Sequence, residues 1–197
     1  MEPITTITGT AIPLDRSDVD TDQIIPAEWL KRVERTGFGE GLFGAWRKDA
    51  SFPLNDKRYT DACILIAGPN FGTGSSREHA VWALTDFGFK AVISPRFGDI
   101  FRNNSTKAGL VPVEVTPEIG AALMKAVQDD PSLELIIDIH SRTLGCLGAG
   151  IETEFPLDEF TRMRFLQGLD DIGLTLRNAD AIDAYEAKRN SWLPIVG

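Results

Sequence analysis

Residues 68–80 constrain the fold of this chain most, because they form a glycine-rich corner between two different sequence patterns. An apolar run with strand character at residues 62–67 precedes the corner, and a helical pattern at residues 77–87 follows it and ends at Gly88. A strand, a glycine loop and a helix N-terminus are therefore expected in that order. Such a corner directs backbone N–H groups and the positive end of a helix dipole toward one point, which favours a carboxylate or a phosphate.

Individual residues of the corner suit an anionic ligand. Gly72 and Gly74 permit positive backbone angles and a close approach of a ligand to the main chain. Arg77 adds a planar fork of donors that can hold a carboxylate. A nucleotide-binding loop is the competing interpretation, but no lysine follows the last glycine and the glycine spacing differs from the dinucleotide fingerprint. We expect a carboxylate ligand and keep phosphate as the alternative.

The serines of the corner also have a purely structural interpretation. Ser75-Ser-Arg-Glu78 fits a capping box, in which Ser75 caps the helix and Glu78 reaches back. Ser76 is an equally good cap, and in that arrangement the hydroxyl of Ser75 is free. His79 lies in the first helical turn, and we expect it to pack there without a role in proton transfer.

Four blocks of sequence follow one another along the chain, at residues 18–26, 72–80, 94–113 and 168–176. The block Gly72-Thr-Gly-Ser-Ser-Arg-Glu-His-Ala80 resembles the signature of the swivelling domain in the aconitase superfamily. The other three blocks point to a stand-alone chain of that superfamily, the small-subunit family of 3-isopropylmalate dehydratases. The resemblance extends from about Ile4 to Trp192.

This resemblance implies a fold and a chemistry. The fold is α/β, a single aconitase-type swivelling domain over residues 1–197 with three layers in β/β/α order and a C-terminal helical extension at about 158–197. The reaction is that of a hydro-lyase in leucine biosynthesis, in which a hydroxyl moves between neighbouring carbons of a malate-type dicarboxylate by dehydration and rehydration. A [4Fe–4S] cluster supplies the Lewis acid. Ser75 matches the base that removes a proton from carbon, and Ser76 and Arg77 match residues that hold a substrate carboxylate.

The cysteine count bears on where such a cluster is held. The chain has two cysteines, Cys63 in an apolar run and Cys146 in a glycine-rich turn, whereas a cluster takes about three or four thiolates. We therefore expect no cofactor on this chain and place the cluster on a large-subunit partner. We expect the chain to be inactive alone.

Charge and the N-terminal segment argue against several other classes of function. The net charge is −9 without a basic cluster, which argues against nucleic acid and anionic membranes as partners. Asp18, Asp20 and Asp22 imitate the start of a calcium loop, but the glycine and the glutamate expected next are missing, so we expect no metal. The N-terminal residues lack the pattern of a signal peptide, and no apolar run has membrane-spanning length, so we expect a cytoplasmic protein.

Two segments are expected near the active site. In the small-subunit family the acidic loop lies close to it, which makes Thr21, Asp22 and Gln23 candidates for positioning substrate. A helix is predicted at 28–35, followed by residues 37–44, where four glycines in eight residues predict a mobile loop that closes over substrate. By resemblance, Leu30 and Val33 line a pocket for an isopropyl group; the alternative is that both pack inward.

The remaining patterns alternate between strands and helices, which indicates an α/β domain. Trp192 and Pro194 of the tail dock either on this chain or on a partner. The predicted elements are strands at 4–12, 91–94, 110–115 and 133–139, a pair of strands within 142–157, and helices at 98–108, 117–129, 158–168 and 178–190.

The sequence leaves two other functions open. The chain could be the small subunit for a related acid, of the 2-methylmalate or homoaconitate type. It could also be a non-catalytic module that holds an anion in the glycine-rich corner.

Overall fold

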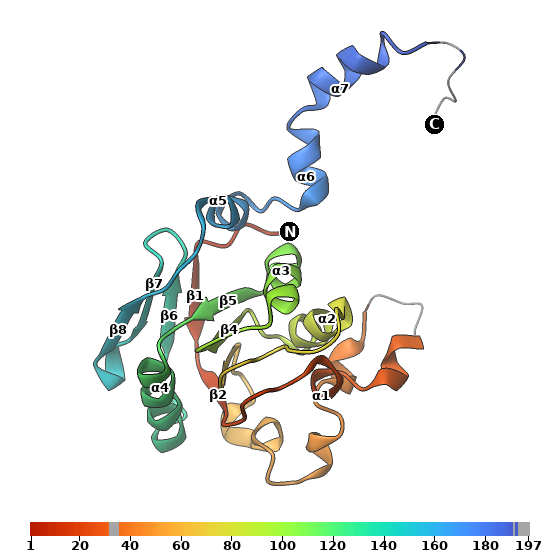
Figure 1. The fold of residues 1–197 in the computed structure, drawn as a ribbon. Helices are drawn as coiled ribbons and strands as arrows, with labels where there is room; N and C mark the ends of the chain where they lie inside the picture. Colours follow the sequence, from red (N-terminus) through yellow and green to blue (C-terminus); the bar gives the residue numbers. More distant parts are fainter. Residues whose placement is uncertain (32–35, 191, 193–197) are drawn as a thin grey trace.

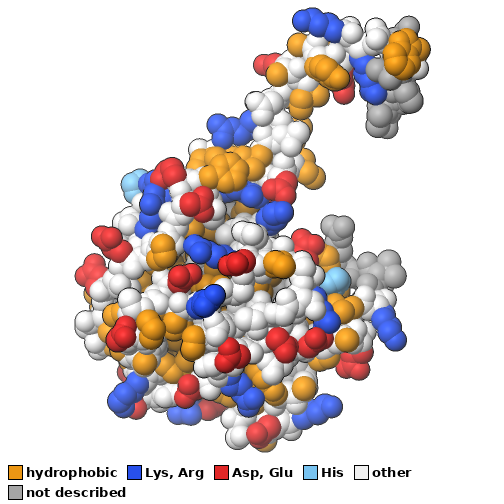
Figure 2. Space-filling view, viewed as in Figure 1, with side chains coloured by type: hydrophobic (Ala, Val, Ile, Leu, Met, Phe, Trp, Pro, Cys, Tyr) orange, Lys and Arg blue, Asp and Glu red, His pale blue; other side chains and the backbone are white. Residues whose placement is uncertain are grey.

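The chain folds into a body, up to residue 168, from which residues 169–190 project as an arm (Figures 1 and 2). The structure is a computed structural model that describes residues 1–31, 36–190 and 192. No helix among these described residues is long and apolar enough to cross a membrane.

The body contains a parallel and an antiparallel sheet, each of four strands. The parallel sheet has the order β2 (Ala11–Leu14), β3 (Ile64–Ala67), β4 (Ala91–Ser94), β5 (Val111–Glu114). The antiparallel sheet has the order β1 (Thr6–Gly9), β6 (Leu135–Asp138), β7 (Thr143–Cys146), β8 (Ile151–Glu154). Together with the helices they form the mixed α/β fold that the sequence predicts.

The predicted single strand at 4–12 is wrong, because this segment contributes to both sheets. Residue Thr6 of β1 lies opposite Asp138, whereas Ala11 of β2 pairs with Ile64 in the parallel sheet. Gly9 ends the first strand at the point where the chain changes sheets. A Cβ atom on Gly9 would lie 2.5 Å from the sulfur of Cys63. A side chain at this position would therefore have to displace the Cys63 sulfur.

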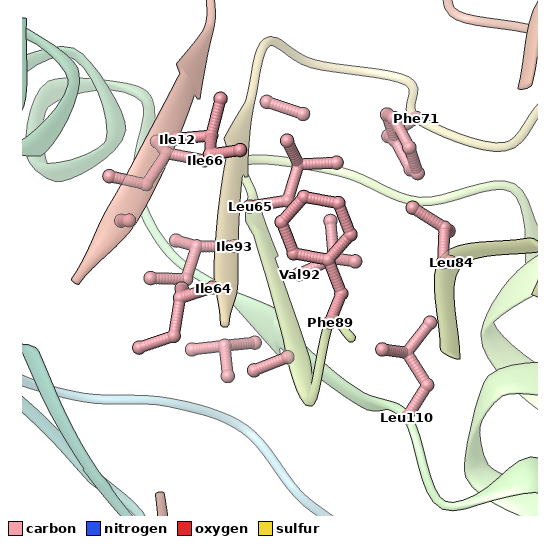
Figure 3. Close-up of a cluster of buried hydrophobic side chains, with 14 of the residues drawn as sticks. Ile12, Ile64, Leu65, Ile66, Phe71, Leu84, Phe89, Val92, Ile93 and Leu110 are labelled. Atoms are coloured by element: carbon pink, nitrogen blue, oxygen red, sulfur yellow. The ribbon is translucent and has the colours of Figure 1, made fainter. Parts of the chain in front are cut away.

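The parallel sheet is buried on both faces, which explains its continuous apolar strands. Every residue of β2, β3 and β4 is buried. Figure 3 shows Ile64 and Ile66 on one side of the sheet and Leu65 on the other, where Leu84 of the helix α2 (Glu78–Phe87) also lies. The helices that surround this sheet are α2 (Glu78–Phe87), α3 (Asp99–Ala108) and α4 (Pro117–Asp129), and α4 contacts β2, β3 and β4.

Most of the other predicted elements are confirmed, with ends that differ by a few residues. The predicted strand pair within 142–157 is the hairpin β7–β8, whose turn contains the 3-10 helix η6 (Leu147–Ala149). Helix α5 (Glu159–Gln167) and helix α7 (Ala179–Glu186) correspond to the two predicted C-terminal helices. Among the described residues, two short α-helices lie outside the predicted elements, α1 (Thr21–Ile24) and α6 (Asp171–Leu176).

The described part of the segment predicted as a helix and a mobile loop is a series of short 3-10 helices, and residues 32–35 lie outside the described residues. Its described part begins with η1 (Ala27–Lys31), and η2 (Phe38–Gly41) packs against α2. The N–H of Phe38 donates to Asp86 Oδ2 at 2.9 Å, and a Cβ atom on Gly39 would lie 2.8 Å from the backbone nitrogen of Phe87. Gly39 therefore serves close packing in a turn that contacts α2, which differs from an open glycine-rich loop, and closure over substrate stays a prediction. Further 3-10 turns follow as η3 (Trp46–Lys48), η4 (Pro53–Asn55) and η5 (Lys57–Tyr59).

Candidate active site

The glycine-rich corner joins β3 to α2 with its glycines in left-handed conformations. Gly72 has φ +75° and Gly74 has φ +88°, angles that side chains disfavour. Gly72 also lies against the ring of Phe101, which leaves no room there for a Cβ atom. The chain beyond Gly74 is thereby turned outward, and Ser75 and Ser76 are exposed.

Residues 94–101 support the corner from one side. Phe71 and Phe97 form a parallel bridge, in which the N–H of Phe71 donates to the Arg96 carbonyl at 3.0 Å and that of Gly98 to the Phe71 carbonyl at 2.9 Å. The buried hydroxyl of Ser94 lies 2.8 Å from the carbonyl oxygen of Gly68. The sequence alone did not predict that residues 94–101 support the glycine-rich corner. Gly98, in the block 94–113, is the one signal there of a close approach between two backbone segments.

Residues 19–22 support the corner from the other side. The N–H of Gly72 donates to the Val19 carbonyl at 2.7 Å, and the N–H of Thr21 donates to the Thr73 carbonyl at 3.0 Å. The hydroxyl of Thr21, 2% exposed, donates to the backbone carbonyl of Ser75 at 3.1 Å. Three of the four sequence blocks therefore meet at one corner.

Arg77 is oriented by an ion pair with Asp22 across this junction. Nη1 of Arg77 contacts Oδ1 of Asp22, and the side chains are 19% and 55% exposed, respectively. A guanidinium has five N–H donors, so a contact through Nη1 leaves donors for a second anion. The structure thus brings together Asp22 and Arg77, two predicted site residues that are 55 positions apart.

Neither serine acts as a helix cap, which corrects the structural interpretation of the motif. Helix α2 begins at Glu78, and its N-cap is Arg77, which makes no side-chain cap hydrogen bond. Within the described part of the chain, the hydroxyls of Ser75 and Ser76 have no hydrogen-bond partner and both residues are exposed. The corner therefore offers two hydroxyls at a helix N-terminus.

Gln23 and His79 have structural roles that the structure makes visible. Gln23 is exposed and closes a capping box at the start of α1, since its Oε1 accepts from the N–H of Asp20 at 2.9 Å. His79 packs between aromatic rings, with centroids 5.3 Å from Phe38 and 4.7 Å from Trp82. Leu30 is half-buried in η1, and Val33 lies outside the described residues.

The acidic loop and the cysteines do not form a metal site in the described residues. Asp18 accepts from the Asn70 amide at 2.7 Å, Asp20 caps α1 and Asp22 pairs with Arg77. The described ranges contain no group of three or more His, Cys, Asp or Glu residues placed to hold an ion. Cys146 is buried, and burial raises the pKa of the half-buried Cys63 thiol, which disfavours the thiolate that a metal needs. These residues do not fit an iron–sulfur cluster.

The chain is similar to known proteins over nearly its whole length. A family model described as the aconitase C-terminal domain matches residues 1–118, and a model of the C-terminal domain of the 3-isopropylmalate dehydratase small subunit matches residues 171–194. The 3-isopropylmalate dehydratase small subunit of Frankia alni is 59% identical over 194 residues, 98% of each chain. That of Salinispora tropica is 55% identical over 196 residues, 100% of each chain. A crystal structure of 3-isopropylmalate dehydratase from Methanocaldococcus jannaschii aligns with a TM-score of 0.66 at 26% identity, and it covers 92% of this chain and 99% of its own.

Proposed function

This chain belongs to the family of 3-isopropylmalate dehydratase small subunits, and we propose that residues 72–77 are its contribution to an active site completed by a large subunit. The enzyme of this family is a hydro-lyase that interconverts 2-isopropylmalate and 3-isopropylmalate in leucine biosynthesis. One observation carries the proposal. The hydroxyl of Ser75 is exposed at the N-terminus of α2, and Arg77 is two residues away.

Ser75 is the proposed base. Its Oγ takes a proton from the substrate carbon next to a carboxylate and returns a proton to carbon in the reverse step. A free serine hydroxyl is a poor base, so its anionic form requires stabilisation by positive groups. The positive end of the α2 dipole, the loop N–H groups and the guanidinium of Arg77 are available for that purpose. The Thr21 hydroxyl fixes the Ser75 carbonyl and thus the position from which the side chain acts.

Gly74, Ser76 and Arg77 are the proposed carboxylate site. Gly74 is exposed and lacks a side chain, so a carboxylate can approach its backbone. Ser76 offers a hydroxyl and Arg77 offers a charged fork, which together suit the two oxygens of one carboxylate. Asp22 holds Arg77 in place, and Gln23 contributes indirectly, because it closes the cap of the helix that carries Asp22.

Leu30 and Val33 are the proposed contacts of the isopropyl group. An isopropyl substituent distinguishes this substrate from malate-type acids without one, and branched apolar side chains recognise it by burial. Leu30 is half-buried in η1, so part of its surface is available for such a contact.

The [4Fe–4S] cluster implied by the family resemblance is assigned to the large subunit. The cysteines and carboxylates of the described residues do not fit it, and the roles proposed for Ser75, Ser76 and Arg77 use only groups of this chain. Two unbridged thiols suit a reducing compartment, so we place the enzyme in the cytoplasm.

An assay of the reconstituted enzyme tests this function. The chain alone, the cluster-loaded large subunit alone and the assembled pair are each given 3-isopropylmalate without oxygen, and absorbance of the unsaturated intermediate is followed. We expect turnover in the pair only. Turnover of 2-methylmalate or of a homoaconitate-type acid in place of isopropylmalate would reassign the substrate, and phosphate binding without turnover of any such acid would favour the non-catalytic module.

A further inference from the structure

The arm exposes more large apolar side chains than a solvated segment of its length requires. Helices α6 and α7 lead away from the body (Figure 1), and apolar surface lies along them (Figure 2). Ile172 is 71% exposed, Leu176 64%, Ile182 37% and Tyr185 73%. Exposed apolar patches of this kind mark interaction surfaces.

These side chains lie on defined faces of the two helices. Ile172 and Leu176 are four residues apart on α6, and Ile182 and Tyr185 are three apart on α7, so each pair shares one helix face. Three acidic residues accompany the apolar pair on α7, and their spacing places them beside and behind it: Asp180, Asp183 and Glu186. We call the four apolar side chains the arm stripe.

The base of the arm contacts the body through Asp170, Asp171 and the neighbouring Gly168. Asp170 Oδ1 accepts from the N–H of Gly173 at 2.7 Å and caps α6, and Asp170 Oδ2 lies 3.6 Å from the N-terminal amine. Arg164, whose side chain is 8% exposed, lies 3.0 Å from Asp171 through Nη2 and Oδ1. Gly168, with φ +65°, approaches the N-terminal segment so closely that a Cβ atom would lie 2.7 Å from the Met1 carbonyl oxygen. These contacts orient α6 while its apolar face stays outside.

We propose that the arm stripe docks into an apolar groove of the large subunit, an inference that rests on the proposed function of this chain in a two-subunit enzyme. The first family model describes a domain that is the C-terminal part of aconitase, whereas the relatives of matching length are separate small subunits. A separate subunit lacks a covalent tether and needs contacts that replace it. The second model, specific to this small subunit, matches residues 171–194 and so includes both helices of the arm.

Charge favours this occupant over a second copy of the chain. The chain carries a net charge of −9, and Asp180, Asp183 and Glu186 accompany the stripe. Two stripes in contact would bring together two chains of net charge −9, with Glu186 beside the contact, at an electrostatic cost. A groove with apolar walls and a basic rim would match both the apolar pair of α7 and the carboxylate of Glu186 beside that pair.

The test compares variants of the full chain in binding to the full large subunit. In one variant Ile172→Ser is combined with Leu176→Ser; a second variant is Tyr185→Ser, at a separate place on the stripe. Leu147→Ser is the matched control, because Leu147 is 77% exposed on the β7–β8 hairpin of the body. The dissociation constant is measured by calorimetry, and turnover is measured against small-chain concentration. We expect a complex weaker by about tenfold or more for each stripe variant, normal turnover once the small chain saturates, and an unchanged control.

The outcomes separate docking from function. Dissociation constants equal to wild type for both stripe variants would overturn the docking proposal, as would a wild-type pair that does not associate. Sedimentation of the small chain alone tests whether a second copy of the chain occupies the arm stripe. A wild-type dimer that the stripe variants convert to monomer would also overturn the docking proposal. If the wild-type pair binds but lacks turnover of isopropylmalate, the proposed function fails, while the ratio of dissociation constants still supports or overturns docking.

Discussion

At the scale of residues, the corner obtains its chemistry from one block and its geometry from two others. An anion site at Ser75, Ser76 and Arg77 could be predicted from the sequence, and it stays a proposal. Their support could not, because the contact between Arg77 and Asp22 joins positions 55 apart, and the Thr21 bond to the Ser75 carbonyl spans 54. Sequence spacing alone also leaves the capping role of the serines open, and the start of α2 at Glu78 decides against it.

The ion pair at this scale predicts that Asp22→Asn impairs catalysis without unfolding the chain. Loss of the carboxylate leaves Arg77 free to turn, so the substrate carboxylate is held less well, and kcat/KM should fall by about 10- to 100-fold. The unfolding midpoint should change little, since Asp22 is 55% exposed. Steady-state kinetics of the assembled enzyme and urea denaturation measure the two effects.

Asp61→Asn is the matched control for this variant, because it removes another exposed carboxylate of the body. It should leave kcat/KM unchanged. An Asp22→Asn enzyme with wild-type kinetics would show that the pair does not position Arg77.

At the scale of elements, the sequence predicts a helix or strand best where its residue pattern fits only one type of element. The continuous apolar run of β3, the pattern of α2 and its end at Gly88 are all found in the structure. The strand at 4–12 is misassigned from sequence because both halves have strand patterns, and only the pairing of β1 with β6 and of β2 with β3 shows where the chain changes sheets. The glycines at 37–44 suggest flexibility, but their role depends on α2, which follows about 40 residues later.

The packing of η2 on α2 predicts that Gly39→Ala destabilises the chain. A Cβ atom there would lie 2.8 Å from the Phe87 nitrogen and 2.9 Å from the Asp86 carbonyl carbon, so η2 would have to move away from the helix backbone. We expect a loss of about 1–3 kcal/mol in the free energy of unfolding, measured by chemical denaturation.

Gly145→Ala is the control for this prediction. Gly145 lies in β7, and a Cβ atom there would have no atom within 4 Å, so its cost should be small. Equal unfolding free energies for the two variants would contradict the close packing of η2 on α2.

At the scale of the whole molecule, the proposed function treats this chain as half of an active site. The corner is open to solvent, with exposed serines at the N-terminus of α2, and the arm presents apolar side chains away from the body. A corner alone can hold a carboxylate, but proton removal from carbon needs a substrate shielded from water and further positive charge. Both requirements are met in the proposed function when the corner is covered by the large subunit.

The role of Ser75 is tested most sharply by the Ser75→Ala variant in the assembled enzyme, measured for turnover of 3-isopropylmalate, for substrate binding and for association with the large subunit. We expect a fall in kcat of about 10³-fold or more, within the range for loss of a positioned base, with substrate affinity and subunit association retained. The Ser76→Ala variant, assayed in parallel, should mainly raise KM. Wild-type turnover by Ser75→Ala in a fully assembled enzyme would contradict the assignment of the base and, with it, the catalytic role of the glycine-rich corner.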